Sequence, residues 1–144
     1  MAQIIVATHG NFAKGIMDSI KLICGEQENV TCYCAYVDGD NEVDGSRITA
    51  DLIALLDSFP ADEEIIVLAD LLGGSVCNEF IKLSAHRPFH LIAGLNLALL
   101  MEIIFADEIT KESIEEIIGI AQNSISYVNN LVEDDASADE FDSF

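Results

Sequence analysis

Basic residues are scarce in this chain. Its 144 residues include only 6 Lys and Arg against 26 Asp and Glu, which gives a formal net charge of −20 at pH 7. This balance argues against nucleic acid or an anionic membrane surface as a partner, because both attract clustered positive charge. Long apolar runs are missing too, since none approaches the ~18 residues of a membrane-spanning helix.

Recognisable cysteine motifs are also missing. The four cysteines form no CxxC pair and show no spacing typical of a zinc site. The first residues lack the basic and then apolar pattern of a secretory signal peptide. We therefore expect reduced thiols in a cytoplasmic protein.

Apolar residues make up 51% of the chain, enough for the core of one ordinary domain. Short β-branched runs alternate with segments of helical periodicity. This pattern predicts strands over 4–7, 30–37, 65–69 and 90–93, and helices over 12–24, 48–59, 75–83, 95–105 and 113–131. Asn11 is the expected N-cap of the first helix. For the last helix, Ser113 with Glu116 fits a capping box better than Thr110 with Ser113.

Strands that alternate with helices indicate an α/β fold. We expect a single doubly wound domain over residues 1–132, with a mainly parallel four-stranded sheet and helices on both faces. Residues 133–144 hold six acidic residues and no basic one, and they are expected to form a disordered tail. Such sheets bind ligands at the carboxyl ends of strands, where strand order reverses. The segments at those ends are 8–10, 38–41, 70–75 and 94–96.

Two of these segments carry side chains suited to chemistry. His9 follows the first strand and precedes a helix, whose N-terminus favours an anion. Asp70 follows the third strand, where a carboxylate can accept a hydrogen bond from one imidazole nitrogen and leave the other as a nucleophile. The simpler interpretation is a structural histidine and an aspartate that caps the next helix.

Gly73, Gly74 and Ser75 come directly after this aspartate. They form either an ordinary turn with Ser75 as N-cap or a backbone nest for phosphoryl oxygens. The P-loop and the GxGxxG motif are both missing, so a nucleotide site is unsupported. His86 and His90 are four residues apart, but Pro88 interrupts any helix between them, and no metal site is expected there.

Several motifs together resemble the IIA domain of the mannose family of the bacterial sugar phosphotransferase system. Thr8-His9-Gly10 and the segment Asp70-Leu71-Leu72-Gly73-Gly74-Ser75 are specific as a pair. Residues 25–30 and 93–100 add to the likeness, which covers roughly residues 1–131. Many members have a proline where this chain has Val76, and another where it has Asp38. Neither difference touches the expected chemistry.

The resemblance implies a cytoplasmic phosphocarrier that takes a phosphoryl group from the phosphocarrier HPr on His9. The group then passes to a IIB partner, and through it to the IIC and IID membrane subunits and the incoming sugar. Asp70 would orient His9, without a metal or cofactor. Homodimers are common in the family, and a fifth, antiparallel strand exchanged between subunits would involve residues 124–131, which also have a helical pattern. The residues implied in phosphoryl binding are Thr8, Gly10, Gly73, Gly74 and Ser75.

Two other classes remain as alternatives. A receiver-like signalling domain would be phosphorylated on Asp70, but receivers hold Mg²⁺ with an acidic pair after the first strand, where this chain has Thr8 and His9. A flavodoxin-like protein would need a Ser/Thr-rich phosphate loop at the same place, and residues 9–12 are a poor match. Phosphohistidine is labile in acid and stable in base, whereas phosphoaspartate is lost in base, so the bound phosphate distinguishes a histidine from an aspartate acceptor.

Overall fold

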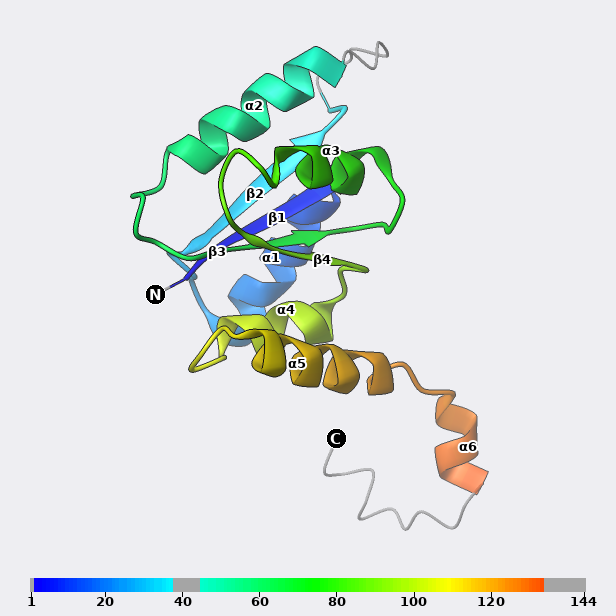
Figure 1. Ribbon diagram of the computed structural model, residues 1–144. Coiled ribbons are helices and arrows are strands. Elements are labelled where there is room, and N and C mark those ends of the chain that lie inside the picture. Colours follow the sequence, from blue (N-terminus) through cyan, green and yellow to red (C-terminus); the bar gives the residue numbers. More distant parts are fainter. Residues whose placement is uncertain (1, 38–44, 134–144) are drawn as a thin grey trace.

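Strands and helices alternate along most of the chain, as the sequence predicts (Figure 1). The computed structural model describes residues 2–37 and 45–133. Within these ranges the elements are β1 (Gln3–His9), α1 (Phe12–Cys24), β2 (Val30–Ala35), α2 (Gly45–Asp57), β3 (Ile65–Ala69), α3 (Ser75–Leu83), β4 (His90–Ala93), α4 (Leu97–Ile104), α5 (Lys111–Asn123) and α6 (Val128–Glu133). No helix among them is long and apolar enough to cross a membrane.

The four strands form one parallel sheet in the order β2-β1-β3-β4. From β1 the chain moves outward to β2, then returns to β3 and moves outward in the other direction to β4. The strand order therefore reverses between β1 and β3. The carboxyl ends of these two neighbouring strands form the place where a doubly wound sheet binds its ligand.

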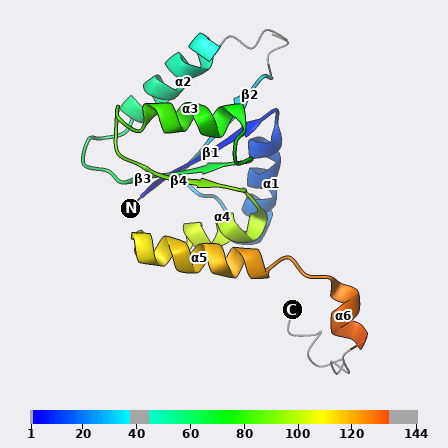
Figure 2. The same ribbon diagram turned by 45° about the vertical axis from the view of Figure 1, so that its right-hand side comes forward.

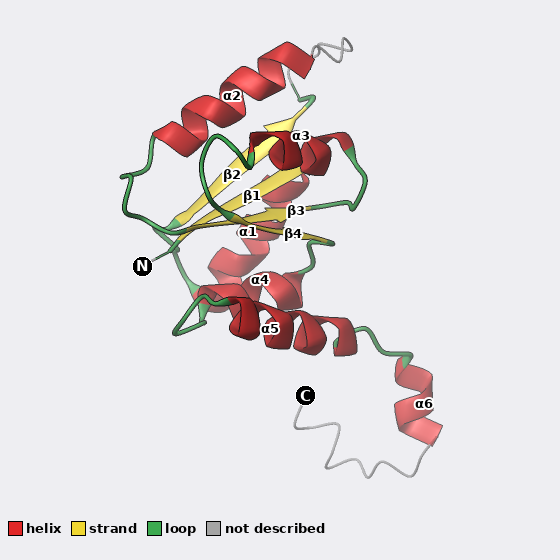
Figure 3. Cartoon of the chain, viewed as in Figure 1, coloured by secondary structure: helices red, strands yellow, loops and turns green. Residues whose placement is uncertain are grey.

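Helices cover both faces of the sheet, which confirms the predicted fold class (Figures 2 and 3). Successive side chains of a strand point to opposite faces. Ile5 and Val67 accordingly pack with residues of α2 and α3, while Val6 and Leu68 pack with residues of α1, α4 and α5. All five residues of β3 are buried, as expected for a strand covered on both sides.

The second strand is shorter than predicted. It ends at Ala35 instead of residue 37, because Tyr36 has a positive φ of 64° and leaves the extended conformation. The acidic segment predicted to follow this strand, 38–41, lies outside the described residues.

The helix predicted over residues 113–131 is two helices, α5 and α6, and residues 124–127 separate them. Ser124 Oγ donates a hydrogen bond to the Ala121 carbonyl at 2.6 Å, a local bond that competes with helix continuation. Ile125 and Tyr127 are exposed, so no burial supports a helix through this segment. Residues 128–133 are helical in this single chain, and the exchange of a strand between two copies stays a prediction. The tail predicted from Glu133 has its first residue in α6, and residues 134–144 lie outside the described residues.

Two helix N-termini differ from the predicted caps. Asn11 holds the N-cap position of α1 but makes no side-chain cap hydrogen bond, and the Thr8 hydroxyl instead accepts from the Ala13 N–H at 2.9 Å. At α5 the Thr110 hydroxyl accepts from the Ser113 N–H, and Ser113 Oγ accepts from the Thr110 N–H. A serine hydroxyl therefore replaces the usual carboxylate of this capping box, and the prediction that the box starts at Ser113 was wrong.

Candidate active site

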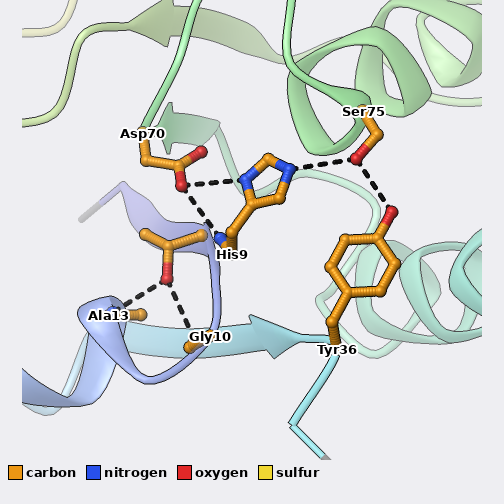
Figure 4. A network of polar contacts seen from close by, with 7 residues as sticks. His9, Gly10, Ala13, Tyr36, Asp70 and Ser75 are labelled. Carbon is orange, nitrogen blue, oxygen red and sulfur yellow. Dashed lines mark hydrogen bonds and ion pairs between the residues drawn. The ribbon is translucent and has the colours of Figure 1, made fainter. Parts of the chain in front are cut away.

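His9 and Asp70 meet where the strand order reverses (Figure 4). The strand β1 extends beyond β3 and ends at His9, and Asp70 follows the last residue of β3. One carboxylate oxygen, Asp70 Oδ2, accepts two hydrogen bonds: from the His9 backbone N–H at 2.9 Å and from His9 Nδ1 at 3.0 Å. Asp70 therefore fixes both the backbone and the ring of the same histidine.

The electrostatics of this pair favour an ionised carboxylate. Burial alone would raise the pKa of Asp70, but the hydrogen bonds from the His9 backbone and imidazole, together with charge interaction with the imidazole, hold it below its ordinary value. The aspartate side chain is 12% exposed and the histidine side chain 38% exposed. The second oxygen, Asp70 Oδ1, is buried without a hydrogen-bond partner. The imidazole thus remains accessible while the group that orients it is shielded.

Ser75 lies on the other side of the imidazole ring. An ionised carboxylate only accepts hydrogen bonds, so His9 Nδ1 must carry a proton, and in the neutral imidazole Nε2 then holds a lone pair. Ser75 Oγ is 3.0 Å from this Nε2. Because Ser75 is the first residue of α3, the unpaired amides and the positive dipole end of that helix lie beside the same nitrogen.

The glycines of the site mainly shape its loops. A Cβ at Gly74 would lie 3.2 Å from His9 Cε1 and 3.1 Å from the Leu71 carbonyl oxygen, so this position allows the backbone to approach the imidazole closely. The Gly74 N–H already donates to that Leu71 carbonyl, and the Gly10 N–H donates to the Ala35 carbonyl. Gly73 has a φ of 80° in the turn before α3.

Thr8 is also committed to the scaffold. It is fully buried, its hydroxyl oxygen accepts from the Ala13 N–H, and the hydroxyl lies 3.4 Å from the Gly10 carbonyl. These contacts hold the turn between β1 and α1, which carries His9 at its start. A buried hydroxyl of this kind supports the position of His9 instead of offering a contact to an incoming group.

Tyr36 belongs to the site although the sequence analysis did not select it. Its hydroxyl lies 2.8 Å from Ser75 Oγ, and its ring centroid is 5.5 Å from that of His9 (Figure 4). The signal that could have found it is its place directly after a strand, at the same edge of the sheet as His9 and Asp70.

The other two histidines lie elsewhere. His90 begins β4, whereas His9 ends β1. The strands are parallel, so His90 lies at their N-terminal ends and His9 at their carboxyl ends. His86 pairs with Asp57 at 2.7 Å, and His90 pairs with Glu64 at 3.1 Å. In the parts of the chain that the structure describes, no group of three or more His, Cys, Asp or Glu side chains is placed to hold a metal ion.

The fold is a doubly wound parallel sheet, and an aspartate-bound histidine lies at its switch point. Comparisons with known proteins identify a family with which this arrangement agrees. Residues 3–122 match the family model EIIA-man, described as "PTS system fructose IIA component". The chain belongs to this family, and it is a IIA component of the sugar phosphotransferase system. The family resemblance seen in the sequence is thereby confirmed.

Individual relatives are similar over most of the chain. The sorbose-specific EIIA component of Klebsiella pneumoniae is 34% identical over 105 residues, which are 72% of this chain and 73% of that protein. The mannose-specific EIIAB component of Escherichia coli K12 is 27% identical over 82% of this chain, but the chain spans only 35% of its length. The crystal structure of an EIIA component from Streptococcus agalactiae superposes with a TM-score of 0.77 at 29% identity, covering 90% of this chain and 99% of that one.

Proposed function

We propose that this chain is a phosphocarrier that accepts a phosphoryl group from phospho-HPr on His9 Nε2 and passes it to a IIB partner. The observation that carries the proposal is the double hydrogen bond from His9 to Asp70 Oδ2. It leaves a lone pair on the exposed nitrogen of an otherwise fixed imidazole. Such a group is a nucleophile that needs no separate base.

The transfer step balances without loss of a proton. The Nε2 lone pair forms a bond to phosphorus, the bond from phosphorus to the donor nitrogen breaks, and the donor nitrogen keeps that electron pair. The His9 ring gains positive character, which the Asp70 carboxylate, 3.0 Å from Nδ1, stabilises. Transfer to the IIB partner reverses these events, and the proton stays on Nδ1 throughout.

The surroundings of Nε2 suit a transferring phosphoryl group, whose charge spreads over three oxygens. Ser75 supplies a hydroxyl, and the first amides of α3 supply positive potential and hydrogen-bond donors. Gly73 and Gly74 give these groups close approach to the imidazole, while Thr8 and Gly10 fix the loop that carries His9. The proposal thus assigns oxygen binding to Ser75 and to the start of α3.

The proposed reaction places the chain in the cytoplasm, between HPr and a IIB component that serves the IIC and IID membrane subunits. We also propose a homodimer, as in many members of the family. Asp70 is a poor alternative acceptor, because its Oδ2 already accepts two hydrogen bonds and its Oδ1 is buried. Phosphorylation there would break both contacts to His9.

The test is phosphorylation of the purified chain with HPr, enzyme I and phosphoenolpyruvate. The wild type should take up one phosphate that is stable in base and labile in acid, and His9→Ala should take up none. His86→Ala is the matched control, because it removes a histidine that also pairs with an aspartate, and it should be labelled like the wild type. Undiminished labelling of His9→Ala, or a label lost in base, would refute the proposal.

A further inference from the structure

A hydrogen-bonded chain of three side chains leads away from the reactive nitrogen. Ser75 Oγ lies 3.0 Å from His9 Nε2, and the Tyr36 hydroxyl lies 2.8 Å from Ser75 Oγ (Figure 4). These side chains come from the end of β1, the start of α3 and the residue after β2. Residues from three separate segments of the chain therefore form one hydrogen-bonded row that ends at this nitrogen.

The direction of each hydrogen bond follows from the carboxylate. Asp70 can only accept, so the Nδ1 proton of His9 points to it, and in the neutral imidazole Nε2 is the acceptor. The single Ser75 hydroxyl proton then points to Nε2, which leaves Ser75 Oγ as the acceptor from Tyr36. Tyr36 therefore donates to Ser75, Ser75 donates to His9, and His9 donates to Asp70.

Tyr36 has an unusual backbone conformation that brings its side chain into this row of hydrogen bonds. Its φ of 64° makes it the one residue other than glycine with a positive φ among the described residues. This region is unfavourable for a bulky residue, and such a conformation persists where surrounding contacts hold it. The Tyr36 ring packs against the His9 imidazole at 5.5 Å with a tilt of 31°, and its hydroxyl reaches Ser75. The unfavourable conformation places the phenol at the reactive site.

We propose that Tyr36 is a positioning residue for phosphoryl transfer at His9, acting through its hydrogen bond to Ser75; this inference rests on the proposed function. The Ser75 proton occupies the Nε2 lone pair in the free protein and must leave it when the nitrogen–phosphorus bond forms. Tyr36 keeps Ser75 Oγ in place during this change, so the released hydroxyl proton turns to a phosphoryl oxygen. Donation by Tyr36 also polarises the Ser75 O–H and strengthens it as a donor.

The test compares Tyr36→Phe with Tyr33→Phe. Both substitutions delete one phenolic hydroxyl and keep the ring, and the Tyr33 hydroxyl binds Asp51 instead of the site. Tyr36→Phe should lower the equilibrium constant for phosphate uptake from phospho-HPr by about fivefold, as expected for a weakened hydrogen bond to a charged group. Tyr33→Phe should match the wild type. Equal uptake constants for Tyr36→Phe and the wild type would overturn the proposal.

The nitrogen chemical shift of His9 Nε2, measured by NMR in the unphosphorylated protein, gives a second, independent readout. The charged group facing this imidazole is Asp70, and the Ser75 hydroxyl faces its other nitrogen, with the Tyr36 hydroxyl bound to Ser75 behind it. In Tyr36→Phe the Ser75 hydroxyl becomes a weaker donor to Nε2, so the Nε2 resonance should move toward that of an imidazole nitrogen without a hydrogen bond. In a Ser75→Ala background the same substitution should change neither readout further, because Tyr36 acts through Ser75.

Failure of this inference and failure of the proposed function are distinguishable. A wild type that takes no phosphate, together with the expected change in the Nε2 chemical shift in Tyr36→Phe, would refute the phosphocarrier function. A wild type that takes phosphate normally, with additive effects of the Ser75 and Tyr36 substitutions, would refute action through Ser75.

Discussion

Replacing Asp70 with asparagine removes a charge while keeping the shape of the side chain. Both the His9 backbone N–H and His9 Nδ1 donate to the same carboxylate oxygen, so the asparagine must place its oxygen there. The reversed amide would set a donor against the His9 N–H. The Nδ1 tautomer, and with it the lone pair on Nε2, is therefore expected to survive. The amide nitrogen would then occupy the position of Asp70 Oδ1, which is buried without a partner.

The magnitude follows from the lost charge. Two unit charges about 4 Å apart attract by about 4 kcal/mol at an effective dielectric constant of about 20. Because the His9 side chain is 38% exposed, water screens this attraction. A hydrogen bond to a charged group is worth about 1.5–3 kcal/mol. This energy corresponds to a transfer rate about 10- to 150-fold lower. A reversed amide would instead protonate Nε2 and cost up to about 10⁴-fold, as with other carboxylates that orient histidine.

The assay is rapid-quench measurement of phosphate transfer from phospho-HPr, with circular dichroism as a check of the fold. Asp57→Asn is the matched control, because Asp57 pairs with His86 at 2.7 Å at a distance from the site, and its transfer rate should equal that of the wild type. A wild-type rate in Asp70→Asn would show that the carboxylate charge plays no part in transfer.

The same variant has a defined pH dependence of stability. The pKa of Asp70 is lowered by folding from an ordinary value of 3.8, so its stabilising contribution is complete above about pH 4. It is lost as the pH falls through the folded-state pKa. The difference in free energy of unfolding between the wild type and Asp70→Asn should therefore shrink below about pH 4 in urea titrations. A difference that stays constant into the acid range would contradict the lowered pKa.

Two further predictions concern the scaffold. Gly74→Ala should leave the chain folded but displace the imidazole, since the new Cβ would lie 3.2 Å from His9 Cε1. Single-turnover transfer should then slow by about threefold to 100-fold. An unchanged rate would mean that the loop moves and the imidazole stays in place. Burial, helped by a hydrogen bond and charge interaction with Asp51, raises the pKa of Tyr33 to about 12. Ultraviolet titration should show one late tyrosinate step that disappears in Tyr33→Phe, and folding stability from this group should fall only as the pH rises above the ordinary tyrosine value.

The parts of the fold that depend on burial could be predicted from the sequence. The strands over 65–69 and 90–93 and the helix over 75–83 have the predicted bounds, because apolar runs and helical periodicity report burial directly. The pairing of His9 with Asp70 could be predicted from parallel topology, since residues that follow neighbouring parallel strands lie at the same end of the sheet.

The features that could not be predicted depend on local conformation. Sequence pattern does not show that Tyr36 turns to a positive φ, the conformation in which its hydroxyl contacts Ser75. Short polar side chains form several alternative local hydrogen bonds, which is why Thr8 caps α1 in place of Asn11. The break after α5 has the same origin in Ser124.

One arginine, Arg87, holds together the loops at the N-terminal ends of the strands, away from the site. Arg87, in the connection between α3 and β4, donates hydrogen bonds to four backbone carbonyls in α2 and in the connection that leads to β3, those of Leu56, Phe59, Pro60 and Glu63. Only a planar guanidinium carries enough fixed donors for this task, so lysine is no substitute. The N-terminal and carboxyl ends of the strands consequently differ in which property a substitution changes. Changes at Arg87 should lower the stability of the fold and leave the chemistry at His9 intact, whereas changes at His9 and its partners should affect phosphoryl transfer, with or without a loss of stability. Natural or engineered variants can be sorted by this position before any measurement.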